Sequence, residues 1–115
     1  MEFAIADDEV WLSVFDALPQ WEDASGDSYV RELKIPVSET GELHLSWDPA
    51  ERSVRLRYRQ GPDVVVDVFR EQATVLTIHQ PGPVIAVEYQ AEDCLGRMRV
   101  QLQPTFALED VFLRT

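Results

Sequence analysis

The chain has 115 residues and a formal net charge of -11, and apolar residues make up 45% of it. This length predicts one domain spanning residues 1–115, and this apolar fraction excludes an intrinsically disordered chain. The single cysteine, Cys94, excludes an internal disulfide, and no apolar run is long enough for a signal peptide or membrane span, so we expect a cytoplasmic protein.

The first 27 residues hold most of the excess negative charge. They contain eight acidic side chains and no Lys or Arg, which leaves a net charge of only -3 on the remaining 88 residues. Such a segment attracts basic surfaces and repels nucleic acid and anionic lipid, although an acidic balance also serves solubility alone. The eight acids are Glu2, Asp7, Asp8, Glu9, Asp16, Glu22, Asp23 and Asp27.

One helix is predicted, over residues 7–18. Its apolar positions recur at intervals of three and four residues, at Trp11, Val14, Phe15 and Leu18. Asp7 is the expected N-cap, Asp8 and Glu9 lie in the first turn where the helix dipole favours anions, and Pro19 ends the helix. Three of the eight acids therefore have a structural explanation in helix initiation.

From Tyr29 onward the apolar period changes from 3.6 to 2, which predicts strands. Turn signals such as Gly61-Pro62 and Gly96 separate them, and the spacing leaves no room for crossover helices. The predicted fold class is α+β, with the helix packed on a mainly antiparallel sheet of seven to eight strands. We expect this sheet to be strongly curved or split into two layers. The expected core is Trp11, Val14, Phe15, Leu18, Leu33, Leu45, Trp47, Leu56 and Val66.

Two hairpins can be paired from the sequence. In the first, one register places apolar residues opposite each other on one face and charged or polar residues on the other. It pairs Trp47 with Val54, Leu45 with Leu56, Leu43 with Tyr58, Glu42 with Arg59, His44 with Arg57 and Ser46 with Arg55. In the second hairpin, the Gly61-Pro62 turn is expected to place Arg59 opposite Asp63 and Arg55 opposite Asp67.

Known catalytic and metal-binding patterns are absent from the sequence. The histidines His44 and His79 and the cysteine Cys94 show no metal-ligand spacing, and the acids before Cys94 are not the electropositive surroundings that activate a thiol. We therefore expect no enzyme activity, no catalytic, metal or cofactor-binding residues and no cofactor. Two alternatives stay open: a small-molecule or lipid-binding β-cup, and an enzyme with an unrecognised carboxylate site, such as His79 with Asp67.

The arginines Arg52, Arg55, Arg57 and Arg59 are the candidate nucleic-acid contact. Strand alternation sends Tyr58 to the face opposite the last three, so it cannot stack on bases beside them, and the net negative charge opposes phosphate. We therefore expect a partner that is neither nucleic acid nor membrane.

The segment from Leu12 to Ala24 resembles the opening of a bacterial immunity-protein family whose members neutralise polymorphic toxins. Phe15, Pro19, Trp21, Asp23 and Ala24 fit that pattern, whereas Glu22 stands where the family has His. The resemblance implies a cytoplasmic, non-enzymatic toxin inhibitor with a β-rich body. The partner would be the cognate toxin or another basic protein, and the oligomeric state is left open.

The expected partner-binding residues are Asp16, Trp21, Glu22, Asp23 and Asp27. An exposed Trp is a frequent binding hot spot, and acids around it accelerate capture of a basic partner. In the opposing interpretation, Trp21 packs as part of the core.

Overall fold

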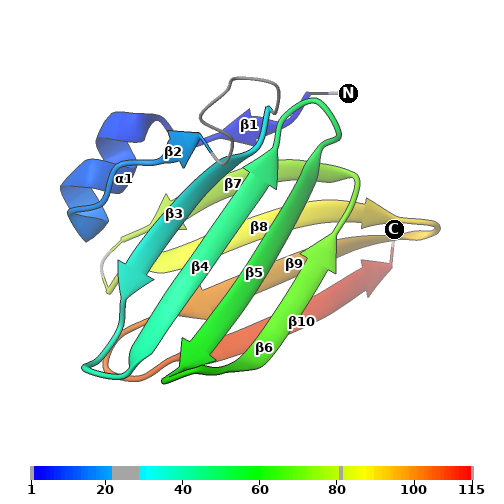
Figure 1. Ribbon diagram of the computed structural model, residues 1–115. Helices are drawn as coiled ribbons and strands as arrows, with labels where there is room; N and C mark the ends of the chain where they lie inside the picture. The colour runs from blue at the N-terminus through cyan, green and yellow to red at the C-terminus, as the bar shows by residue number, and fades with distance from the viewer. Residues whose placement is uncertain (1, 22–28, 81, 115) are drawn as a thin grey trace.

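The computed structural model describes residues 2–21, 29–80 and 82–114, with side chains described as far as residue 112. Two five-stranded sheets pack face to face, and one helix closes one side of the sandwich (Figure 1). We call the sheet with strand order β1-β7-β8-β9-β10 sheet A, and the sheet with order β2-β3-β4-β5-β6 sheet B. The fold class predicted from the sequence, α+β with one helix on mainly antiparallel strands, is confirmed.

The elements follow each other along the chain with short connections. The helix α1 spans Asp8–Phe15. The strands are β1 (Ala4–Ile5), β2 (Gln20–Trp21), β3 (Arg31–Pro36), β4 (Gly41–Asp48), β5 (Ser53–Gln60), β6 (Asp63–Arg70), β7 (Ala73–His79), β8 (Val84–Ala91), β9 (Cys94–Gln101) and β10 (Ala107–Arg114).

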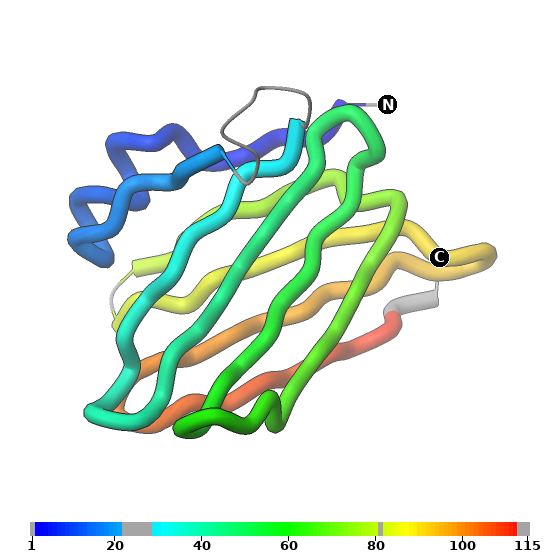
Figure 2. Tube along the Cα trace, in the orientation of Figure 1, coloured from blue at the N-terminus to red at the C-terminus, as the bar shows by residue number. Residues whose placement is uncertain are grey.

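The first two strands were not predicted, because two residues are too few to show alternation. β1 pairs with β7 in parallel, Ala4 with Val75 and Ile5 with Leu76, whereas all other strand pairs are antiparallel among the described residues. The trace in Figure 2 shows the N-terminal segment running along sheet A, then through α1, then back to sheet B. The N-terminal region thereby links the two sheets at one side of the sandwich.

The helix is shorter than predicted. Asp7 does hold the N-cap position, but its side chain makes no capping hydrogen bond. The helix ends at Phe15 because Asp16 adopts a left-handed conformation with φ 55, from which its N–H donates to the carbonyl of Leu12. In the part of the chain that the structure describes, no helix is long and apolar enough to cross a membrane.

The core lies between the two sheets. Five of the predicted core residues are at most 3% exposed: Trp11, Leu33, Leu45, Trp47 and Leu56. Val14, Phe15 and Val66 are partly buried. The prediction is wrong for Leu18, which is 47% exposed because it follows the end of the helix. α1 is held by Trp11, whose ring stacks on Trp47 with the centroids 5.6 Å apart.

The register of the β4–β5 hairpin is confirmed at all six predicted pairs. The register of the β5–β6 hairpin is wrong: Arg59 lies opposite Val64, and Arg55 lies opposite Phe69. A register shift between Tyr58 and Arg59 accounts for part of the offset, because it adds one residue to β6. The expected partnership of Arg55 and Asp67 nevertheless forms, as a diagonal contact.

Candidate functional site

Two of the five predicted partner-binding residues, Asp16 and Trp21, lie in the part of the chain that the structure describes. Asp16 is exposed at the end of α1, and Trp21 is 57% exposed at the end of β2. Glu22, Asp23 and Asp27 lie outside the described residues. The interpretation of Trp21 as a core residue is therefore wrong, and its ring is available to a partner.

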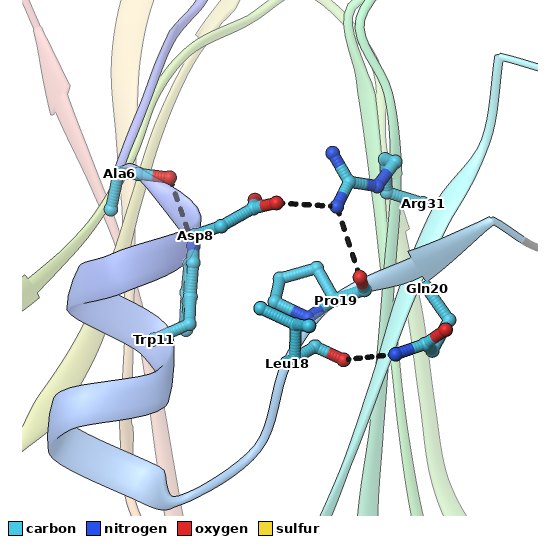
Figure 3. A network of polar contacts seen from close by, with 7 residues as sticks. All are labelled: Ala6, Asp8, Trp11, Leu18, Pro19, Gln20 and Arg31. Carbon is cyan, nitrogen blue, oxygen red and sulfur yellow. Dashed lines mark hydrogen bonds and ion pairs between the residues drawn. The ribbon is translucent and has the colours of Figure 1, made fainter.

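Arg31 connects Trp21 to the helix. Its Nη2 donates to Oδ2 of Asp8 at 2.8 Å and to the carbonyl of Pro19 at 3.0 Å (Figure 3). Its guanidinium carbon also lies 4.7 Å from the centroid of the Trp21 ring, within cation–π range. One of the eight N-terminal acids, Asp8, is thus neutralised by a strand arginine rather than offered to a partner.

The outer side of α1 combines acids with apolar groups. Glu9, Leu12 and Asp16 are exposed and follow helical spacing, so they lie along one side of the helix. Leu12 is 46% exposed between these two carboxylates, and Val10 and Leu18 are exposed to similar extents. We call Glu9, Leu12, Asp16, Leu18 and Trp21 the N-terminal face; its mixture of apolar groups and carboxylates suits a partner that presents both apolar and basic groups.

The arginines of β5 lie on the outer face of sheet B and are interleaved with acids. Arg55 donates to both carboxylate oxygens of Asp67, at 3.0 and 2.8 Å. These hydrogen bonds from Arg55 hold the pKa of the Asp67 carboxyl below its usual range. Tyr58 points to the opposite face, where its ring stacks on Phe106 with a centroid separation of 4.1 Å. This arrangement offers no aromatic platform beside the arginines.

The two histidines do not form the carboxylate site considered as an alternative. His44 lies 3.0 Å from a carboxylate oxygen of Glu32 on the outer face of sheet B. His79 ends β7 in sheet A, whereas Asp67 belongs to sheet B and is bound by Arg55, so the proposed His79–Asp67 pair does not form. Within residues 2–21, 29–80 and 82–114, no group of three His, Cys, Asp or Glu side chains is arranged to hold a metal ion.

A hollow of about 510 Å³ lies on the outer face of sheet A. Its lining includes Thr77, His79, Glu88, Arg97 and Arg99, and Arg97 is paired with Glu88 at 3.3 Å. The β-cup alternative requires an apolar cavity, but this hollow is open, lies outside the sandwich and is lined by charged side chains as well as by Val75 and Ala86. It therefore does not support a lipid-binding site.

A second exposed apolar surface, which the sequence did not reveal, lies on β6 and β10. We call it the edge surface; its residues are Val64, Val65, Phe69 and Phe112, which are 43% to 58% exposed. In the sequence, the run from Val64 to Phe69 predicts a strand, but an apolar run is equally compatible with a buried strand. Only the strand order places it at the edge.

Beneath the edge surface, the buried Tyr89 and the partly buried Arg70 and Asp110 join the two sheets. The hydroxyl of Tyr89 donates to Oδ1 of Asp110 at 2.7 Å, and Arg70 donates to Oδ2 of the same carboxylate. Burial, followed by the hydrogen bond to Asp110, raises the pKa of Tyr89. These contacts fix the distance between β6 and β10, which belong to different sheets.

The fold of this chain is similar to that of a protein of known structure. The chain superposes on a chain of the contact-dependent growth inhibition toxin–immunity protein complex from Klebsiella pneumoniae 342, with a TM-score of 0.83 and 12% identity, over 98% of this chain and 100% of that one. The catalase-peroxidase of Novosphingobium aromaticivorans is 37% identical over 70 residues, which are 56% of this chain. This chain spans 9% of the length of that protein. No protein-family model matches the sequence.

Proposed function

We propose that the protein is a non-enzymatic immunity protein, which binds a cognate protein toxin in the cytoplasm and occludes it. The observation that carries this proposal is the fold shared over 98% of the chain with a component of a toxin–immunity protein complex. The resemblance of residues 12–24 to an immunity-protein family supports it independently. The catalase-peroxidase match covers 9% of that protein, and we base no activity on it.

The N-terminal face is the proposed contact surface. Trp21 would fill a pocket of the toxin, and the stacked guanidinium of Arg31 already restricts its ring. A side chain that is ordered before binding loses less conformational entropy in the complex. Asp16, together with Glu22, Asp23 and Asp27 of the adjoining segment, would pair with basic groups around that pocket.

Charge supports a basic partner. The net charge of -11 is concentrated in the first 27 residues, and Asp16 and Glu9 of that segment are exposed. Complementary charge can raise association rate constants to about 10⁸–10⁹ M⁻¹s⁻¹ at low salt, and the acceleration falls as salt screens it. Because a toxin must be captured quickly after it enters the cell or is made there, a steered encounter suits an inhibitor.

The test is binding to the product of the neighbouring gene, measured by stopped-flow at two salt concentrations. We expect the association rate constant to fall with salt, and Glu22→Lys with Asp23→Lys to slow association. Trp21→Ala should weaken the complex about 30-fold, as expected for a binding hot spot. The matched control is Glu92→Lys, which changes an exposed acid in the β8–β9 turn, at the end of the sandwich opposite α1 (Figure 1).

Two results would contradict the proposal. One is the absence of any complex with the wild-type protein. The other is a complex whose kinetics respond equally to Glu92→Lys and to the charge reversals at Glu22 and Asp23, since net charge alone would then explain the effect. Circular dichroism of each variant checks that the fold is retained.

A further inference from the structure

The free edges of the two sheets lie together, on the side of the sandwich away from α1 (Figure 1). β6 is the last strand of sheet B and β10 the last strand of sheet A, and each is eight residues long. Arg70 of β6 binds Asp110 of β10, so the two edges are neighbours. An unpaired edge strand presents free N–H and C=O groups to any extended chain that approaches it.

β6 carries no Lys or Pro, two of the residues that natural sheets use to guard their edges, and reads Asp-Val-Val-Val-Asp-Val-Phe-Arg. Its protection is limited to the bulge near Val65 and to charged residues, which leave apolar side chains exposed between them. Val65 and Phe69 are 56% and 49% exposed on it, and Phe112 of β10 is 58% exposed. The edge surface holds four of the ten large apolar side chains that are exposed in the described part of the chain.

The edge surface includes a hollow in which an apolar side chain could lie. The hollow measures about 460 Å³, and Phe69, Phe112 and Tyr89 are among its lining residues. The Tyr89 and Phe112 rings meet edge to face at 6.0 Å, and Tyr89 is held by its hydrogen bond to Asp110. The Tyr89 wall of the hollow is therefore held in place before any partner arrives, which lowers the entropic cost of binding.

The negative charge around the edge surface favours a basic partner over a second copy of this chain. Residues 63–72 and 107–112 contain five acids and one base, Arg70, which is itself bound to Asp110. Asp63, Glu71 and Glu109 are exposed around the apolar side chains. A second copy of this chain would bring the same acids face to face in a two-fold interface, and it would add another charge of -11. A basic segment would instead meet the exposed carboxylates of Asp63 and Glu71.

We propose that the edge surface binds an extended, basic segment of a partner protein, which adds to β6 as a further strand. Backbone hydrogen bonds to β6 would supply affinity, and an apolar side chain of the segment would enter the hollow between Phe69 and Phe112. Lys or Arg side chains of the segment would face Asp63 and Glu71. This surface is separate from the N-terminal face, so the inference stands or falls independently of the toxin proposal.

The experiment is an NMR titration of the full chain with three short synthetic peptides. The first alternates Lys with Val and Phe, the second replaces every Lys with Glu, and the third alternates Lys with Ser. We expect the first peptide to shift the amide signals of β6 and the ring signals of Phe69 and Phe112, and the other two to leave them unchanged. The double variant Phe69→Ser, Phe112→Ser should weaken binding about tenfold.

The matched control is the double variant Leu12→Ser, Leu18→Ser, which removes apolar groups of similar exposure from the N-terminal face. It should bind the first peptide as the wild type does. If the Phe69 and Phe112 variant does not fold, Val65→Ser tests the same surface with a smaller change.

The inference is overturned if the shifts lie outside β6 and β10, or if the Glu or Ser peptide binds equally well. It is also overturned if the edge variants bind the first peptide as tightly as the wild type. A molecular mass that rises with protein concentration, together with shifts at the edge surface in the absence of peptide, would show that a second copy occupies the surface instead.

Discussion

Gly96 lies in the interior of β9, where the sequence predicted a turn. Its neighbours explain the difference: Tyr89 lies opposite it on β8 and Phe112 on β10. A Cβ atom at this position would lie 2.1 to 2.7 Å from three atoms of the Tyr89 ring. The glycine therefore permits close approach of an aromatic ring to the strand, rather than a reversal of the chain.

We expect Gly96→Ala to lower the free energy of unfolding by about 1–3 kcal/mol, because the buried Tyr89 ring must move to admit the methyl group. Urea denaturation measures the change. In a Tyr89→Leu background the same substitution should cost less, since the smaller side chain leaves space for the methyl group. An equal cost in both backgrounds would mean that the ring contact is not the cause.

Among single residues, the sequence predicts those whose role is local. The side of the strand on which Arg55, Arg57 and Tyr58 lie follows from alternation alone, and the structure confirms it. Arg31 breaks the alternation of β3, and no local rule explains it. Its partners, Asp8 and the carbonyl of Pro19, are 23 and 12 residues away, so only the tertiary structure accounts for it.

At the scale of elements, Arg31 joins α1 and β2 to sheet B. It binds Asp8 in the first turn of the helix and the chain just before β2, and it stacks on Trp21. Trp11 holds the helix from the core side by stacking on Trp47, while its Nε1 donates to the carbonyl of Ala6 at 3.0 Å. The short helix, whose eight residues are marginal alone, depends on these tertiary contacts.

We expect Arg31→Met to lower the free energy of unfolding by about 1–3 kcal/mol, because it removes charge-assisted hydrogen bonds that are partly buried. Hydrogen exchange should show a larger loss of protection in α1 than in β4 and β5. Lys34→Met is the matched control, since it changes an exposed base on the same strand. If both substitutions lowered the stability and the protection of α1 equally, Arg31 would not be what anchors the helix.

The hairpins show where prediction at this scale succeeds and where it fails. The β4–β5 register is predictable because apolar pairs on one face and polar pairs on the other agree on a single alignment. The β5–β6 register is not, because the apolar run from Val64 to Val66 carries no alternation that could reveal the shift at Tyr58 and Arg59. The helix boundary is also misjudged, since Asp16 rather than Pro19 ends it.

For the whole molecule, the two sheets share one core, and residues far apart in the chain form it. β1 pairs with β7 across some 70 residues, and Trp11 packs against Trp47. The inner faces of sheets A and B pack against each other in one apolar core, so neither sheet could bury its apolar side chains without the other. The molecule should therefore unfold as one unit.

We expect a single cooperative unfolding transition, with coincident curves from far-ultraviolet circular dichroism and tryptophan fluorescence. Refolding should take milliseconds to seconds, as for other β-sandwiches, because the β1–β7 pair and the packing of the two sheets join residues that are distant in sequence. Two separated transitions would indicate that the sheets fold independently, contrary to the predicted single domain.

The sequence by itself determines the class of fold, the number and approximate limits of the longer strands, one hairpin register and the segregation of charge. These follow from periodicity and composition, which act over neighbouring residues. The tertiary structure alone decides which strands are edges, why Val65 and Phe69 are exposed, and that Asp8 is neutralised by Arg31. The physical reason is that exposure and ion pairing depend on contacts between segments whose separation along the chain carries no local signal.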